Sequence, residues 1–184
     1  MPPAPAPASS LQIFLDLDGI PGESTDKQFP RQIEVLSYEQ SIKQTILRMA
    51  EGGMAAGRPE FPDLRFRKAL DRASPELLLA CASGRRFASA TFSFRRLAPA
   101  RPTLYTVTLG DVLITQVTQI AGAGAHYPLT FAALDTGDDR AAILDEIALA
   151  YARIEWTYQP LAKDGTPSGP PVSAGWDVTT SRPG

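Results

Sequence analysis

Residues 85–120 read RRFASATFSFRRLAPARPTLYTVTLGDVLITQVTQI, and this stretch decides the fold class. In the first half, Phe92 and Phe94 alternate with Ser93 and Arg95, which is the period of a strand with one buried face. The second half has the same period, with a break at Gly110 that indicates a bulge or a turn. The short link APARP joins the two halves, so the sequence predicts two long antiparallel strands.

Other segments extend the β pattern. Strands are predicted over residues 11–17, 32–42 and 173–180. Residues 138–160 have a composition that favours helix, but apolar residues alternate from Ile147 onward, so a strand is predicted over 147–158. Residues 50–63, AEGGMAAGRPEFPD, are rich in Gly and Pro and are expected to form a long loop.

A single helix is predicted at about residues 74–83. Ser74 suits the N-cap, Pro75 the first helical position and Gly84 the C-cap. The apolar side chains of this helix are expected to face the core, and they are Leu77, Leu78, Leu79 and Cys81.

Composition excludes several classes of function. The chain has 184 residues and a formal net charge of −2, so no basic surplus indicates nucleic acid binding, and no apolar run is long enough for membrane insertion. Residues 1–10, MPPAPAPASS, are expected to form a flexible tail without the features of a signal peptide, before a single domain over 11–184. One Cys (Cys81) and one His (His126) allow no internal disulfide and no zinc site built from these two types alone.

One motif offers an enzymatic alternative. Residues 13–24, IFLDLDGIPGES, end an apolar run in Asp-x-Asp-Gly, as in haloacid dehalogenase-like Mg-dependent phosphatases. In that interpretation Asp16 is the nucleophile, Asp18 the general acid and Lys68 neutralises the phosphate, with the acidic stretch 137–145 at the metal. Against it, Ile20 stands where such a motif has Thr, and the strands follow one another directly, whereas that fold alternates strands and helices.

The order of motifs resembles the haemolysin co-regulated protein (Hcp) family, which forms the inner tube of the bacterial type VI secretion system. The matching segments are DGIPGESTDK (18–27), RQIEVLSYEQSI (31–42), RFRKALDRASPELLLACASGRRF (65–87) and, near the end, IEWTYQP, KDG, SGPP and AGWDV. Together with LYTVTLGDVLITQV they cover most of residues 11–178. The tail and residues 118–140 depart from the pattern.

The resemblance implies a mainly β fold: a phage tail-tube-like antiparallel β-barrel or two packed sheets with one helix. It implies a homohexamer in stacked rings that carries effectors in its lumen, with the VgrG spike and a contractile sheath as partners. Such a protein is no enzyme and has no catalytic, metal or cofactor residues. It is cytoplasmic before firing and then secreted through the apparatus. A tube protein of a related contractile injection system or phage tail is a second alternative.

The resemblance also assigns residues. Glu39 and Ser41 are candidates to face the lumen and its cargo. A ring-stacking loop is expected at Gly52, Gly53, Met54, Gly57 and Arg58. Structural roles are expected for the motif residues Gly22, Glu23, Ser24, Asp26, Lys27, Ser74, Pro75, Cys81 and Gly84.

Overall fold

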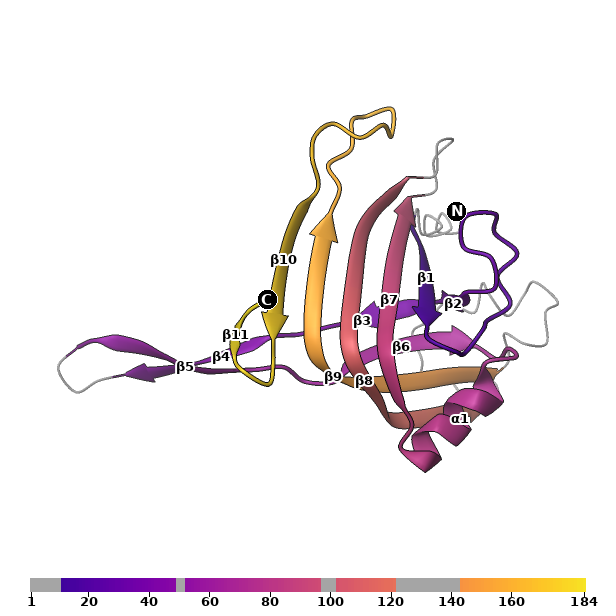
Figure 1. Cartoon of the computed structure of the whole chain (residues 1–184), viewed down its shortest axis with the longest axis horizontal. Helices are drawn as coiled ribbons and strands as arrows, with labels where there is room; N and C mark the ends of the chain where they lie inside the picture. Colours follow the sequence, from indigo (N-terminus) through magenta and orange to yellow (C-terminus); the bar gives the residue numbers. More distant parts are fainter. Residues whose placement is uncertain (1–10, 49–51, 97–101, 122–142) are drawn as a thin grey trace, which may run out of the picture.

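Antiparallel strands make up most of the chain in the computed structural model (Figure 1), which describes residues 11–48, 52–96, 102–121 and 143–184. The elements in chain order are β1 (Leu11–Leu17), β2 (Ile33–Val35), β3 (Ser37–Glu39), β4 (Lys43–Arg48), β5 (Met54–Glu60), β6 (Leu64–Ala69), α1 (Ser74–Ser83), β7 (Arg86–Arg96), β8 (Thr103–Ala121), β9 (Ile143–Tyr158), β10 (Val172–Asp177) and β11 (Arg182–Pro183). The tail 1–10, His126 and residues 137–142 lie outside the described residues.

The main sheet follows the order β11-β10-β9-β8-β7-β1-β2, and β6 adds to it by pairing with both β9 and β3. All of these pairings are antiparallel. The predicted pairing of the two long strands is confirmed by the β7–β8 ladder, in which Phe92 lies opposite Val107. Gly110 is no turn: β8 continues through it, and a Cβ there would lie 2.9 Å from the Arg153 Nε.

The long strands β8 and β9 bend, so that they contribute to two layers (Figure 1). One half of β9 pairs with β6 and the other half pairs with β10. The predicted strand 32–42 is split at Leu36 into β2, which pairs with β1, and β3, which pairs with β6. The sheet is a path with ends and is not fully closed, so the two-layer form of the predicted fold is the one observed.

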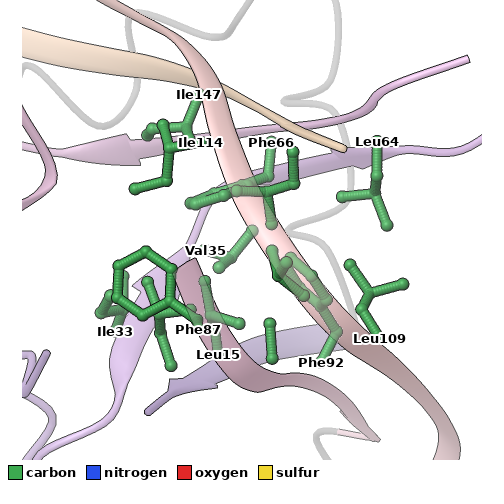
Figure 2. Packing of buried hydrophobic residues seen from close by; sticks show 14 of the residues in the cluster. Leu15, Ile33, Val35, Leu64, Phe66, Phe87, Phe92, Leu109, Ile114 and Ile147 are labelled. Carbon is green, nitrogen blue, oxygen red and sulfur yellow. The ribbon is translucent and has the colours of Figure 1, made fainter. Parts of the chain in front are cut away.

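The core lies between the two layers (Figure 2). Leu15, Phe92 and Leu109 come from one layer, and Phe66 and Ile147 from the other, all at most 1% exposed. Their alternation with polar neighbours along each strand is what made the strands visible in the sequence.

Helix α1 has the predicted limits and ends at Gly84, whose φ of 64° is the left-handed conformation that favours glycine. Two expectations about it are wrong. The N-cap position is Ala73, because the Ser74 hydroxyl is buried and accepts a hydrogen bond from Lys68 instead of capping the helix. Leu77 and Cys81 pack on the core as expected, but Leu78 and Leu79 are exposed.

The predicted loop 50–63 is also wrong for most of its length. Residues 54–60 form β5, which pairs with β4 as a separate two-stranded sheet. We call this hairpin, residues 43–48 and 54–60, the arm. Its Gly and Pro residues concealed the strand from the sequence pattern, since both are depleted in strands.

The segment with the motif GESTDK folds over the outer face of β1 and β7. Gly22 is required there, because a Cβ would lie 2.3 Å from the Gln32 carbonyl oxygen. Ser24 is buried, and the Glu23 carboxylate accepts a hydrogen bond of 3.1 Å from the Arg72 backbone N–H. Lys27 is exposed.

Asp26 attaches the GESTDK segment to β7 through an ion pair with Arg95. Its Oδ2 lies 2.7 Å from the Arg95 Nη2, and the Arg95 side chain is 1% exposed. The Arg95 guanidinium also lies over the rings of Phe14 and Phe29, which stack on each other with centroids 4.7 Å apart. The structural role expected of the motif residues stays a prediction, with which the contacts of Asp26 and Glu23 agree. Among the described residues, no helix has the length and apolar character needed to cross a bilayer.

This ion pair predicts a pH dependence of stability. The Arg95 side chain lowers the pKa of Asp26 to about 2, whereas an unfolded Asp titrates near pH 3.9. Because the pKa is lower in the folded state, the contribution is complete above about pH 4 and is lost as the pH falls toward 2. At pH 6 we expect the Asp26→Asn variant to have a lower urea midpoint of unfolding than wild type. At pH 3 the difference between the two midpoints should be smaller than at pH 6. A difference that does not change with pH would contradict this.

Candidate functional site

The arm is the most distinctive surface of the subunit. It extends well beyond the body on the side of β10 (Figure 1). Its two strands pair only with each other in the described chain, with a register shift between Gln44 and Ile46. An isolated two-stranded hairpin is marginally stable in water. The arm therefore needs support, either from the body or from another molecule.

The body supports only the root of the arm. The Arg58 Nε donates a hydrogen bond of 3.1 Å to the Ser181 Oγ, and Phe61 stacks on Trp176 with ring centroids 6.1 Å apart. The Gln44 amide donates to the Gly57 carbonyl across the hairpin at 2.6 Å. The contacts of Arg58 and Phe61 with the body fix the direction in which the arm leaves it.

The outer part of the arm exposes apolar side chains. Ile46, Leu47 and Met54 are 58%, 55% and 76% exposed. Ile46 and Met54 lie on one face of the hairpin and Leu47 on the other, so both faces of the outer arm are partly apolar. Of the five residues predicted for a stacking loop, Gly52 and Gly53 lie before β5, Met54 begins it, and Gly57 and Arg58 are within it.

Ile46 and Leu47 were not singled out by the sequence reasoning. The signal that could have found them is the β-favouring run KQTILR directly before the Gly-rich residues, which indicates the first strand of a hairpin.

Glu39 and Ser41, the candidate lumen residues, are both exposed. Glu39 lies opposite Arg65 in the β3–β6 ladder. Its neighbour Tyr38 points inward, where its ring contacts Phe92 edge-on at 5.1 Å, so Glu39 faces away from the core. Ser41 lies between β3 and the arm.

Charged side chains continue this outer face across β6 and β9. The Arg67 Nη2 lies 2.7 Å from the Glu146 Oε2, and the Arg65 Nη1 lies 3.5 Å from the Glu146 Oε1. With Glu39 these residues form a polar, hydrated surface that suits transient contact with a passing molecule.

The residues of the phosphatase alternative are not brought together in the way that chemistry requires. Asp16 and Asp18 are exposed at the end of β1, but Lys68 is fully buried in the β6–β9 ladder and its four partners are all protein groups. All strand pairings in the described chain are antiparallel, whereas the phosphatase fold needs a parallel sheet. The fold therefore overturns the interpretation of the chain as a haloacid dehalogenase-like phosphatase.

Lys68 instead joins the helix to the sheet. Its Nζ lies 2.9 Å from the Asp145 Oδ2 and 2.7 Å from the Asp71 Oδ1, and it donates to the Ser74 Oγ at 2.8 Å. The Ser74 hydroxyl in turn donates to Asp145, and the Gln119 amide donates to the other Asp145 oxygen at 2.9 Å. Every polar atom of the two buried charges thus has a partner, which makes this a structural cluster.

Comparison with known proteins agrees with this geometry. The family described as "Type VI secretion system effector, Hcp" matches residues 14–158. Protein hcp1 of Pseudomonas aeruginosa is 29% identical over 170 residues, which are 92% of this chain and 96% of that protein.

Solved structures have the same fold. Hcp1 from Salmonella typhimurium superimposes with a TM-score of 0.72 at 25% identity, over 95% of this chain and 99% of that one. A structure titled as a type six secretion system protein superimposes with a TM-score of 0.80 at 22% identity, over the same shares of the two chains.

The buried cluster predicts a large effect of one substitution. Lys68→Met leaves Asp145 buried without its counter-charge, and we expect the free energy of unfolding to fall by about 3–5 kcal/mol. The double variant Lys68→Met/Asp145→Leu should recover much of that loss, because it removes both charges. Chemical denaturation measures both.

Arg65→Met is the matched control for this experiment. Arg65 is half-exposed and its ion pair is long, so the loss should stay within about 1 kcal/mol. A Lys68→Met protein that is as stable as the Arg65→Met protein would show that the buried cluster contributes little.

Proposed function

The chain belongs to the Hcp family of the type VI secretion system, and from this premise we propose that its copies close into six-membered rings that stack into a hollow tube. In such a ring one surface of a subunit meets a different surface of its neighbour, and the rotation closes. The tube transports other proteins and makes or breaks no bonds.

The observation that carries this proposal is the arm. Its root is fixed to the body by Arg58 and Phe61, while its outer part exposes Ile46, Leu47 and Met54 to water. A subunit that worked alone would gain nothing from such an extension, and the exposed apolar side chains would favour aggregation. As a contact with the next ring, the arm buries them.

Transport requires a lumen surface that contacts the effectors, and partners at the end and around the outside of the tube. We propose that the outer face of β3, with Glu39, and the neighbouring Ser41 line the lumen and contact secreted effectors. The tube is capped by the VgrG spike and surrounded by the contractile sheath. The subunit is made in the cytoplasm and leaves the cell through the apparatus.

Ring formation is tested by mass and by imaging. Six copies of the 19.8 kDa chain give about 119 kDa, which light scattering after size exclusion resolves from a monomer. Electron microscopy should show rings with an empty centre. A protein that stays monomeric at high concentration would refute the proposed assembly.

The arm is tested with Leu47→Glu. A charge on this exposed side chain should leave the subunit folded by circular dichroism, but raise the concentration needed for stacking at least about tenfold, equivalent to about 1.4 kcal/mol. Deletion of residues 52–57 should act in the same way, because the core contains none of them. Leu36→Glu is the matched control: Leu36 is an exposed leucine of the body, and this variant should stack like wild type.

The lumen assignment is tested with Glu39→Lys. Because Glu39 is exposed and faces away from the core, the reversed charge should preserve folding and ring mass while reducing effector export several-fold. The readout is the amount of effector in the medium relative to the amount of tube protein exported in the same cells. Equal export of effector by wild type and variant would remove Glu39 from the lumen surface.

A further inference from the structure

Helix α1 has two apolar sides, and only one of them is used within the subunit. The side facing the core carries the buried residues Ser74, Leu77 and Ala80. The opposite side carries Pro75, Leu78, Leu79 and Ala82, which are all exposed. These four positions have the spacing i, i+3, i+4 and i+7, which places them on one continuous face of a helix. We call this face the α1 stripe.

The α1 stripe has the composition of a buried surface. Leu79 is 69% exposed, more than Leu36 or Leu47. An amphipathic surface helix normally has polar residues opposite its core-facing side. Here the only charged side chain of α1 is Glu76, at the margin of the stripe. The sequence prediction that Leu78 and Leu79 are buried was wrong for the single subunit, and their exposure calls for a partner.

A surface of matching chemistry is present on the same chain but out of reach. One face of the outer arm exposes Ile46 and Met54, and Arg48, which lies opposite Met54 on the same face, is opposite in sign to Glu76. Along the longest axis of the molecule the arm projects from one end, whereas α1 lies toward the other end (Figure 1). A chain therefore cannot cover its own stripe with its own arm. Two copies can form this contact head to tail, and the resulting pair still has one free stripe on the first copy and one free arm on the second.

We propose that the α1 stripe is the docking surface for the arm of a second copy of this chain. In this contact Ile46 and Met54, which share one face of the arm with Arg48, cover Leu78 and Leu79, and Arg48 lies near Glu76. The inference rests on the proposed function, because it names the surface that receives the arm in the assembly. A stable interface buries about 1,200–2,000 Å², far more than these few side chains supply. The contact therefore adds to others and orients successive copies.

Disulfide trapping between two differently labelled chains tests the contact. In a Cys81→Ser background, one chain carries Ile46→Cys and the other carries Leu79→Cys. The two chains are co-expressed, purified as the assembly and oxidised. We expect a covalent two-chain band on a non-reducing gel that disappears with reductant. The matched control pairs Ile46→Cys with Val172→Cys, since Val172 is 64% exposed and thus as accessible as Leu79, and this pair should give no such band.

A second measurement separates this inference from the proposed function. Leu79→Glu places a charge at the centre of the stripe, at an exposed position where the fold should tolerate it, and should impair stacking as much as Ile46→Glu does. If Ile46→Glu blocks stacking but Leu79→Glu stacks normally and no band forms, the stripe is not the receptor, while the role of the arm stands. A Leu79→Cys band no stronger than the Val172→Cys band also overturns the inference. Normal stacking by both Glu variants refutes the role of the arm itself.

Discussion

The buried ion pair between Lys68 and Asp145 is the constraint on which the rest of the subunit depends. The two residues are direct partners in the β6–β9 ladder, and both side chains are fully buried. A shift of one residue would move Lys68 to the opposite face and leave Asp145 buried without its counter-charge, which costs several kcal/mol. The pair therefore fixes the register of β6 on β9. Because Asp71 and Ser74 share the same ammonium group, it also fixes where α1 begins.

This register determines where the two candidate contact surfaces lie. The arm ends at Glu60, only a short link before β6, so its root follows the position of that strand. Helix α1 follows β6 at the other end. Strand β6 thus connects the apolar arm at one end to the apolar face of α1 at the other. Its own position is fixed by the buried charges of Lys68 and Asp145. The buried charges of Lys68 and Asp145 are paired, while apolar side chains of the arm and of α1 are exposed, as the proposed assembly requires.

The GESTDK segment is also fixed to the sheet by a buried charge. Arg95 is held between the Asp26 carboxylate and two aromatic rings, so this outer face of the sheet is sealed within the subunit. The arm and the α1 stripe have no such cover. The surface under the GESTDK segment therefore stabilises the fold, whereas the arm and the α1 stripe stay exposed, as the proposed assembly requires.

The sequence by itself determined the strands β7 and β8, the part of β9 from Ile147 onward, the extent of α1 and the family, because alternation, Pro75 and Gly84 are local signals that need no knowledge of distant residues. It could not show that the Ser74 hydroxyl binds Lys68 and Asp145 instead of capping the helix, since these groups meet only after β6 and β9 pair. Nor could it show that Leu78 and Leu79 face water, because periodicity defines the sides of a helix but not which side is covered. Only the tertiary structure decided these points, because burial depends on how the layers close around the core.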